Sequence, residues 1–142
     1  MHFRSICAAF CLTFAMTSGV EAAEPSGVWL TQNGDAHVRI SKCDARICGT
    51  IVWLRDAVDT ATGKPPVDEH NPNLARRNRK IVGITIFAMA PDGSGGFSGS
   101  IYNTDDGGTY QAKITMPGAD QLEIKGCAGP FCGSETWSRV GK

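Results

Sequence analysis

The sequence has no excess of charge of either sign. Its 142 residues contain 14 Lys and Arg against 14 Asp and Glu, so the formal net charge is zero. Proteins that bind nucleic acids through the phosphates usually carry a basic stripe or patch. The one dense basic segment, residues 76–80, is too short for such a surface and is typical of a solvated face or a helix end. We therefore predict no nucleic-acid partner.

Hydrophobic runs of membrane-spanning length are also missing. The apolar run at residues 6–16 is too short to anchor the chain in a bilayer, and no second run approaches that length. Arg4 precedes this run and small residues up to Ala23 follow it, which is the layout of a cleavable secretory signal. We expect residues 1–23 to be a signal peptide cleaved after Ala22 or Ala23. Residues 24–142 should then form one soluble domain in the periplasm or outside the cell.

Motifs of catalysis are equally scarce. After residue 23 the chain has only two histidines, His37 and His70, and it has no G-x-S-x-G, H-E-x-x-H or phosphate-binding glycine loop. Asn103, Asp105 and Asp106 could bind calcium at a hairpin tip, but such residues more often form the turn itself. We expect no enzyme activity, no catalytic residue, no metal and no cofactor.

Cysteine gives the first positive signal. Beyond the predicted signal peptide the chain keeps four cysteines in two pairs with the spacing C-x-x-x-x-C, namely Cys43 with Cys48 and Cys127 with Cys132. An even number of cysteines in an exported chain favours disulfides. Three pairings exist on paper, and the two local bonds need the least rearrangement of the chain. A four-cysteine zinc site is the alternative.

Hydrophobic alternation with a period of two residues predicts strands rather than helices. Tyr110, Ala112, Ile114 and Met116 share one face, while polar residues between them share the other. Short hairpins join nearly all the strands, and such a meander avoids exposed edges most simply by closing. We predict an all-β fold, an eight-stranded antiparallel up-and-down barrel, with an open sandwich as the alternative. The strands are expected near residues 27–31, 36–43, 48–55, 84–90, 97–103, 109–116, 121–127 and 132–140.

One connection, residues 56–83, is much longer than the others. A loop of this length is usually functional or mobile. Inside it, Asn71 followed by Pro72 is typical of a helix N-terminus, so residues 72–79 are expected to form a short basic helix.

Strand direction assigns these features to the two ends of the barrel. The first strand begins at one end, here called the base, near Trp29, and the last strand finishes there near Arg139. An arginine stacked on an indole contributes about 0.5–2 kcal/mol. The long loop falls at the opposite end, the rim. The turn between Cys43 and Cys48 belongs to the base and the other cysteine turn to the rim, so one zinc ion cannot bind all four and two local disulfides are expected.

A barrel of eight strands is either filled by side chains or holds one small ligand. At the rim, His70 with Arg76 and Arg79 could bind a carboxylate or phosphate head group through their donors. Around Trp53 both faces of the strand are apolar, so residues 50, 52 and 54 compete with 51 and 53 for the inside. The expected lining is apolar apart from one phenol and suits a small apolar or amphipathic molecule: Val38, Ile40, Val52, Leu54, Tyr110, Ala112, Ile114, Met116, Leu122 and Ile124.

Several motifs resemble those of known families. Gly27-Val-Trp29 together with Arg139 resembles the lipocalin and calycin group. A wider set is similar to the exported bacterial family known as domain of unknown function 2147, and it covers nearly all of the chain after the signal. The resemblance implies a lipocalin-like barrel, an exported protein and no settled activity. The motifs are Cys43-x-x-x-x-Cys-Gly-x-Ile-Val-Trp-Leu54, Thr62-Gly-Lys-Pro65, Asp68-x-x-Asn71-Pro72, Tyr102-Asn-x-x-Asp-Gly107 and Trp137-x-Arg139.

Together these observations predict a periplasmic or secreted lipocalin-like protein that binds a small apolar or amphipathic ligand in its barrel and performs no catalysis. The alternative is an envelope protein-interaction module with a side-chain-filled barrel, in which the long loop and residues 50–54 contact another protein.

Overall fold

The structure is a computed structural model that describes residue 15 and residues 24–142. The expected signal peptide, residues 1–23, lies outside the described residues apart from Ala15. Among the described residues no helix has the length and apolar character needed to cross a bilayer.

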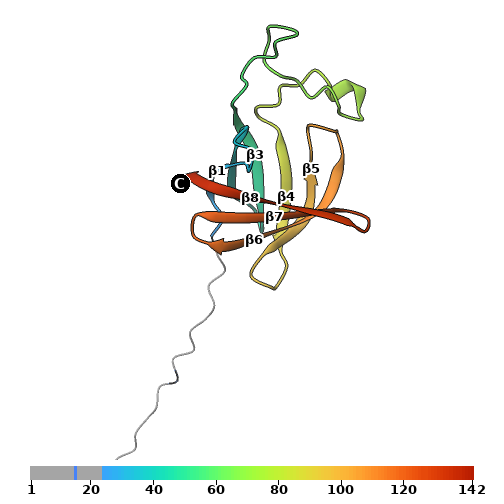
Figure 1. The fold of residues 1–142 in the computed structure, drawn as a ribbon. Helices are drawn as coiled ribbons and strands as arrows, with labels where there is room; N and C mark the ends of the chain where they lie inside the picture. Colours follow the sequence, from blue (N-terminus) through green and yellow to red (C-terminus); the bar gives the residue numbers. More distant parts are fainter. Residues whose placement is uncertain (1–14, 16–23) are drawn as a thin grey trace, which may run out of the picture.

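Eight antiparallel strands form a closed barrel in sequence order, as predicted, and the sandwich alternative is wrong. The first strand pairs with the last, so that Trp29 lies opposite Arg139 and the sheet has no free edge. Figure 1 shows the ring of strands and the long connection that extends beyond one end of it. The strands are β1 (Gly27–Leu30), β2 (Ala36–Cys43), β3 (Arg46–Leu54), β4 (Thr85–Pro91), β5 (Phe97–Tyr102), β6 (Thr109–Gly118), β7 (Gln121–Ala128) and β8 (Phe131–Gly141).

The alternation seen in the sequence sets the inner and outer faces. In β2, Val38 and Ile40 are almost fully buried, whereas Arg39 between them is exposed. In the pair formed by β6 and β7, Ile114 lies directly opposite Ile124 and both are buried. Apolar side chains that alternate along paired strands therefore meet inside the barrel, where their burial stabilises the fold.

The base of the barrel is closed by Trp29 and Arg139. The guanidinium lies 4.3 Å from the centre of the indole ring, and Trp29 is fully buried. Arg139 donates hydrogen bonds to the carbonyls of Ser26 (2.6 Å), Glu24 (3.2 Å) and Ala119 (3.0 Å). The expected contact between the first and last strands is confirmed, and it also holds the segment that enters β1.

The surroundings of Gly27 explain why the G-x-W motif begins with glycine. Its φ of +138° is a backbone conformation that side chains disfavour, and an added Cβ would clash with the Arg139 guanidinium and the Gly141 carbonyl. The glycine therefore leaves room for the arginine above the tryptophan.

Two local disulfides join the cysteines as expected. The bond from Cys43 to Cys48 lies at the base with a Cα separation of 5.8 Å, and that from Cys127 to Cys132 lies at the rim with a Cα separation of 4.1 Å. The two cysteines of the second pair lie directly opposite each other across the β7–β8 hairpin.

The turn after Cys43 is shorter than the expected strand bounds, residues 36–43 and 48–55, imply. Strand β3 begins at Arg46, so Cys43 is opposite Arg46 and Cys48 is opposite Ser41, and the disulfide is diagonal. The positive φ of Asp44 (57°) allows this tighter turn, because aspartate tolerates the left-handed region better than most residues.

The long loop between β3 and β4 contains a shorter helix than predicted. Only Leu74–Arg76 forms a 3₁₀ turn, and its N-cap is Asn73, whose side chain accepts a bond from the Ala75 amide. The expected helix over residues 72–79 with Asn71 as N-cap is wrong. The side-chain amide group of Asn71 is instead bonded to Asp68 and Tyr102, two residues described below.

We predict that Arg139→Lys lowers the free energy of unfolding by about 1–3 kcal/mol. Lysine cannot both stack on the Trp29 indole as a planar guanidinium does and donate hydrogen bonds to three carbonyls at once. The measurement is equilibrium unfolding in urea. The control is Arg39→Lys on the exposed face of β2, which should change stability by less than about 0.5 kcal/mol. Equal effects of the two substitutions would contradict this role of Arg139.

Candidate functional site

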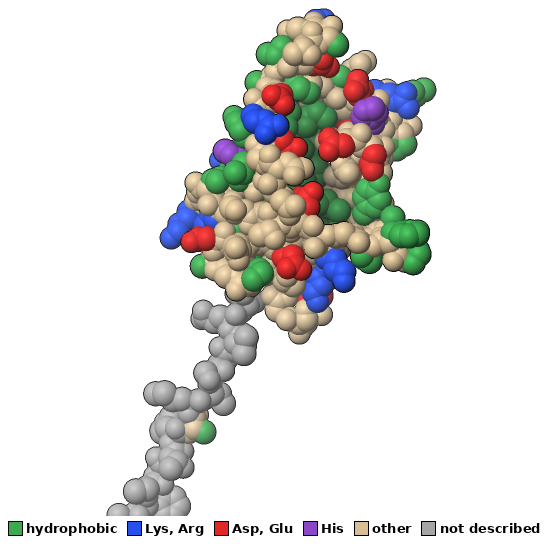
Figure 2. Space-filling model, viewed as in Figure 1, with side chains coloured by type: hydrophobic (Ala, Val, Ile, Leu, Met, Phe, Trp, Pro, Cys, Tyr) green, Lys and Arg blue, Asp and Glu red, His purple; other side chains and the backbone are tan. Residues whose placement is uncertain are grey.

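The rim half of the barrel contains a cavity of about 860 Å³, here called the mouth cavity. Sites for small molecules usually enclose roughly 300–1,000 Å³. The β1–β2 turn, the long loop, the β5–β6 turn and the β7–β8 hairpin border it. Figure 2 shows the hollow, with hydrophobic side chains in its depth and acidic side chains around its edge. The barrel is therefore filled at the base and hollow at the rim.

The depth of the mouth cavity is lined by aliphatic side chains and one indole. They come from β2, β3, β4, β5, β7 and β8 and from the end of the long loop, so the apolar lining surrounds the space. The lining residues of this kind are Val38, Ile51, Leu54, Ile81, Ile86, Ile101, Ile124 and Trp137.

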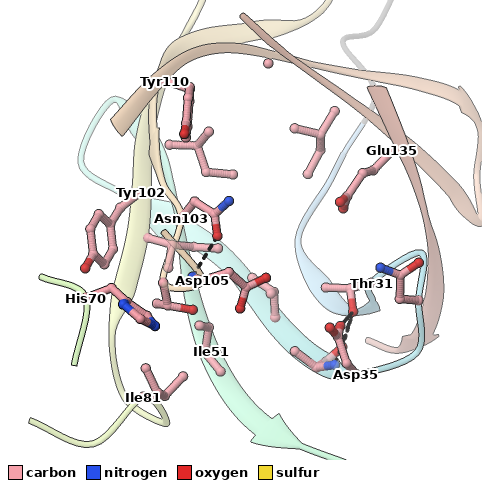
Figure 3. A pocket seen from close by; sticks show the side chains of 18 of the residues that line it. Thr31, Asp35, Ile51, His70, Ile81, Tyr102, Asn103, Asp105, Tyr110 and Glu135 are labelled. Atoms are coloured by element: carbon pink, nitrogen blue, oxygen red, sulfur yellow. Dashed lines mark hydrogen bonds between the residues drawn. The ribbon is translucent and has the colours of Figure 1, made fainter. Parts of the chain in front are cut away.

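The edge of the mouth cavity is acidic. Among the described residues that line it there are five carboxylates and neither Lys nor Arg. Figure 3 shows Asp35, Asp105 and Glu135 around the same open space, with His70 on the opposite side from Glu135. The five are Asp35, Asp56, Glu69, Asp105 and Glu135.

Two of these carboxylates are held by neutral donors from the lining itself. Asp35 accepts a 2.5 Å hydrogen bond from the Thr31 hydroxyl, and Glu135 accepts a 2.9 Å bond from the indole nitrogen of Trp137. Such bonds orient a carboxylate without neutralising its charge.

The predicted ligand-binding residues divide between the cavity, the core below it and the outside. Val38, Leu54, Tyr110, Ile124 and His70 line the mouth cavity. Five others pack in or against the core and do not line it: Ile40, Ala112, Ile114, Met116 and Leu122.

Val52, Arg76 and Arg79 lie outside the mouth cavity, which corrects their expected positions. Ile51 is the inward residue of β3, and Val52 borders a small outer hollow beside Trp53. The pairing of β2 with β3 shifts between His37 and Val38, which lie opposite Trp53 and Ile51. Val52 is therefore an extra residue in β3, and simple alternation fails there. Arg76 is an exposed residue of the 3₁₀ turn.

The acidic edge was missed by sequence reasoning. Four of its members lie in turns and loops, where the sequence has no periodic pattern to indicate which way a side chain points. Glu135 could have been found, because it precedes Trp137 by two residues in one strand and so shares its inward face.

Asp68 connects the long loop to the barrel through hydrogen bonds. Its carboxylate is fully buried. Its Oδ1 accepts a 2.6 Å hydrogen bond from the Tyr102 hydroxyl, and its Oδ2 accepts 2.9 Å bonds from Asn71 Nδ2 and Arg79 Nε. Tyr102 belongs to β5, so the network joins two motifs that are far apart in the sequence. The Arg79 guanidinium therefore pairs with Asp68 and does not face the mouth cavity.

The same segment contacts the β5–β6 turn. Gly107 has a positive φ of +70°, and an added Cβ there would clash with the backbone carbonyl of His70. The buried network and this close contact together fix Glu69 and His70 at the mouth, where their side chains are 3.3 Å apart.

Burial by itself would raise the pKa of Asp68, but hydrogen bonds from Tyr102, Asn71 and Arg79 outweigh it and hold the pKa below its ordinary value. Burial, and then the hydrogen bond to Asp68, raise the pKa of Tyr102. A carboxyl whose pKa is lowered on folding stabilises the fold above its unfolded pKa, about 3.9, and this contribution disappears as the pH falls through the folded pKa.

The hairpin tip considered for calcium forms a turn. Asn103 Oδ1 accepts a bond from the Asp105 amide, and Asp106 accepts bonds from the Gly108 amide and the Tyr110 hydroxyl. In the part of the chain that the structure describes, no group of three or more His, Cys, Asp or Glu residues is arranged to hold a metal ion.

Comparisons with known proteins agree with this fold. The family model described as "Uncharacterized protein conserved in bacteria (DUF2147)" matches residues 27–139. A solved structure described as protein HP1028 from the human pathogen Helicobacter pylori, which belongs to the lipocalin family, is similar with a TM-score of 0.69. The likeness covers 83% of this chain and 84% of that one at 23% identity, and so concerns the fold alone. A search of curated proteins finds no match.

We predict that Asp68→Asn lowers the free energy of unfolding by about 2 kcal/mol at neutral pH, because it removes the charge from a buried hydrogen-bonded set. The difference in free energy of unfolding between the variant and the unmodified protein should become smaller in acid, where protonation of Asp68 removes the same charge. Urea unfolding across the acid range measures both effects. Asp44→Asn, at an exposed turn, is the control, and a difference that does not vary with pH would contradict the role assigned to Asp68.

Proposed function

Since the chain belongs to the bacterial family DUF2147 and has a lipocalin-like barrel, we propose that it binds a small apolar or amphipathic molecule in the mouth cavity. The observation that carries this proposal is the cavity itself, about 860 Å³ with an apolar depth open at the rim. Each methylene group that leaves water for such a surface contributes about 0.8 kcal/mol.

The packing of the base supports this proposal. Trp29, Ile40, Met89, Ile114 and Leu122 are almost fully buried there and complete a core. The mouth cavity is thus a separate region from the packed base. The proposal assigns binding alone and no catalytic step.

We propose further that the protein acts in the periplasm or outside the cell. Two disulfides support this location, since such bonds persist in oxidising compartments. Expression of the full chain in a Gram-negative host should yield a periplasmic protein that begins at Ala23 or Glu24 and has the mass of the fully oxidised chain. Mass spectrometry of the cell fractions checks this. A cytosolic product that retains Met1 and free thiols would contradict it.

A second candidate function, contact with another envelope protein, rests on the outside of β3. Trp53 is 40% exposed, and its ring lies 4.3 Å from that of His37. Beside it, Pro65, Pro66 and Val82 border a hollow of about 170 Å³. Native mass spectrometry of protein from its own periplasm separates the two functions, because a small molecule and a protein partner differ in mass.

Two glycines offer a way to close the mouth cavity without disturbing the fold. Gly126 and Gly133 are opposite each other in β7 and β8 and both line the cavity. A Cβ added at Gly133 would meet nothing within 4 Å. Gly118 at the base end of β6 is equally unobstructed and lies outside the cavity.

We predict that the neutral fluorophore N-phenylnaphthylamine binds the unmodified protein and that Gly133→Leu weakens this binding about tenfold, since the new side chain occupies the apolar space. Gly118→Leu is the matched control and should bind as the unmodified protein does. Fluorescence titration gives the affinities, and thermal unfolding checks that both variants fold. The proposal fails if the fluorophore does not bind, or if it binds all three proteins equally.

A further inference from the structure

We infer that the molecule bound in the mouth cavity is cationic: an organic ammonium group attached to an apolar body. This inference rests on the proposed function and names the chemical class of the ligand. Its basis is the way in which the acidic edge meets the apolar depth.

The negative charge surrounds the mouth instead of lying on one side of it. Asp35 belongs to the β1–β2 turn, Asp56 and Glu69 to the long loop, Asp105 to the β5–β6 turn and Glu135 to β8. Four separate parts of the chain thus contribute carboxylates to one opening. At neutral pH these groups are negatively charged, and their fields add inside a concave surface.

Most of this charge is not balanced by the protein. Among the described residues, Glu69 pairs with His70 at 3.3 Å and Asp56 pairs with the exposed Arg55 at 3.8 Å. No ion pair within the described chain involves the other three carboxylates. The hydrogen bonds to Asp35 and Glu135 come from a hydroxyl and an indole, which carry no charge.

Glu135 connects the charge to the apolar wall. It lies directly opposite Ile124 in the β7–β8 pair, and its carboxylate is bonded to Trp137, whose ring also lines the cavity. An ammonium group beside Glu135 would therefore place its apolar body against Ile124 and Trp137. The indole face itself attracts cations.

The arginines near the mouth are bonded to groups of the protein, which disfavours the anionic head group expected from the sequence. Arg55 pairs with Asp56 and donates to the Asn33 carbonyl. Arg79 Nε donates to the buried Asp68, and Arg77 Nε donates to the Asn71 carbonyl. His70 is the one basic side chain among the described lining residues, and it is next to Glu69. An anionic ligand would meet five like charges and one histidine.

An organic cation fits this edge better than a metal ion does. The carboxylates are spread around the opening, and no group of three or more among the described residues is arranged to hold a metal. A metal ion needs several oxygen ligands at short, similar distances. An ammonium group needs only favourable charge and one or two acceptors, which the edge supplies.

The test uses three probes with the same tail, namely decylammonium, decanol and decanoate. The two charged probes are kept below their micelle concentrations and decanol below its solubility limit. Isothermal titration should show that decylammonium binds about tenfold more tightly than decanol and that decanoate binds less tightly than decanol. Added salt should reduce the difference between decylammonium and decanol, because exposed charges are screened.

The double variant Asp35→Asn with Glu135→Gln should lower the ratio of decylammonium affinity to decanol affinity by about tenfold. Asp44→Asn, an exposed carboxylate at the base, is the control and should leave that ratio unchanged. Equal binding of the three probes, or tightest binding of decanoate, would overturn the inference and leave the proposed cavity function standing. Failure of all three probes to bind would overturn both.

Discussion

The stacking of the Arg139 guanidinium on the Trp29 indole is the contact on which the rest of the barrel depends. It lies where the first strand meets the last, so it stabilises the closure of the sheet. The same guanidinium bonds to the segment that precedes β1 and to the turn after β6. A single side chain therefore joins three parts of the base, and a closed ring of strands allows the opposite end to be built from turns and loops.

The two ends of the barrel have different physical roles. At the base, large apolar side chains fill the interior and leave no space for a ligand. At the rim, the glycines of β7 and β8 leave space open, and the buried Asp68 network fixes one edge of it. This network buries the Asp68 carboxylate, and three hydrogen bonds offset the free-energy cost of removing its charge from water. The same bonds give the long loop a defined position.

Much of the fold could be predicted from the sequence because period-two alternation is a local signal. The strands follow from it, and the short connections give their order. Strand direction then places Trp29 near Arg139, and the spacing of the cysteines predicts the two local disulfides. The interior of β3 could not be predicted, since the extra residue Val52 depends on the pairing of β3 with β2. Nor could the roles of Asp68 and Asn71, because their partner Tyr102 is more than 30 residues away. The turn carboxylates were missed because a turn has no repeating direction.

The described side chains that close the base, such as Trp29 and Arg139, do not line the mouth cavity. A consequence is that selectivity and folding can change independently in this architecture. Libraries that randomise the cavity-lining positions Asn33, Thr104 and Asp105 in the β1–β2 and β5–β6 turns would vary the edge of the cavity and leave the packed base unchanged. The domain is therefore a suitable scaffold for engineered receptors and small-molecule sensors.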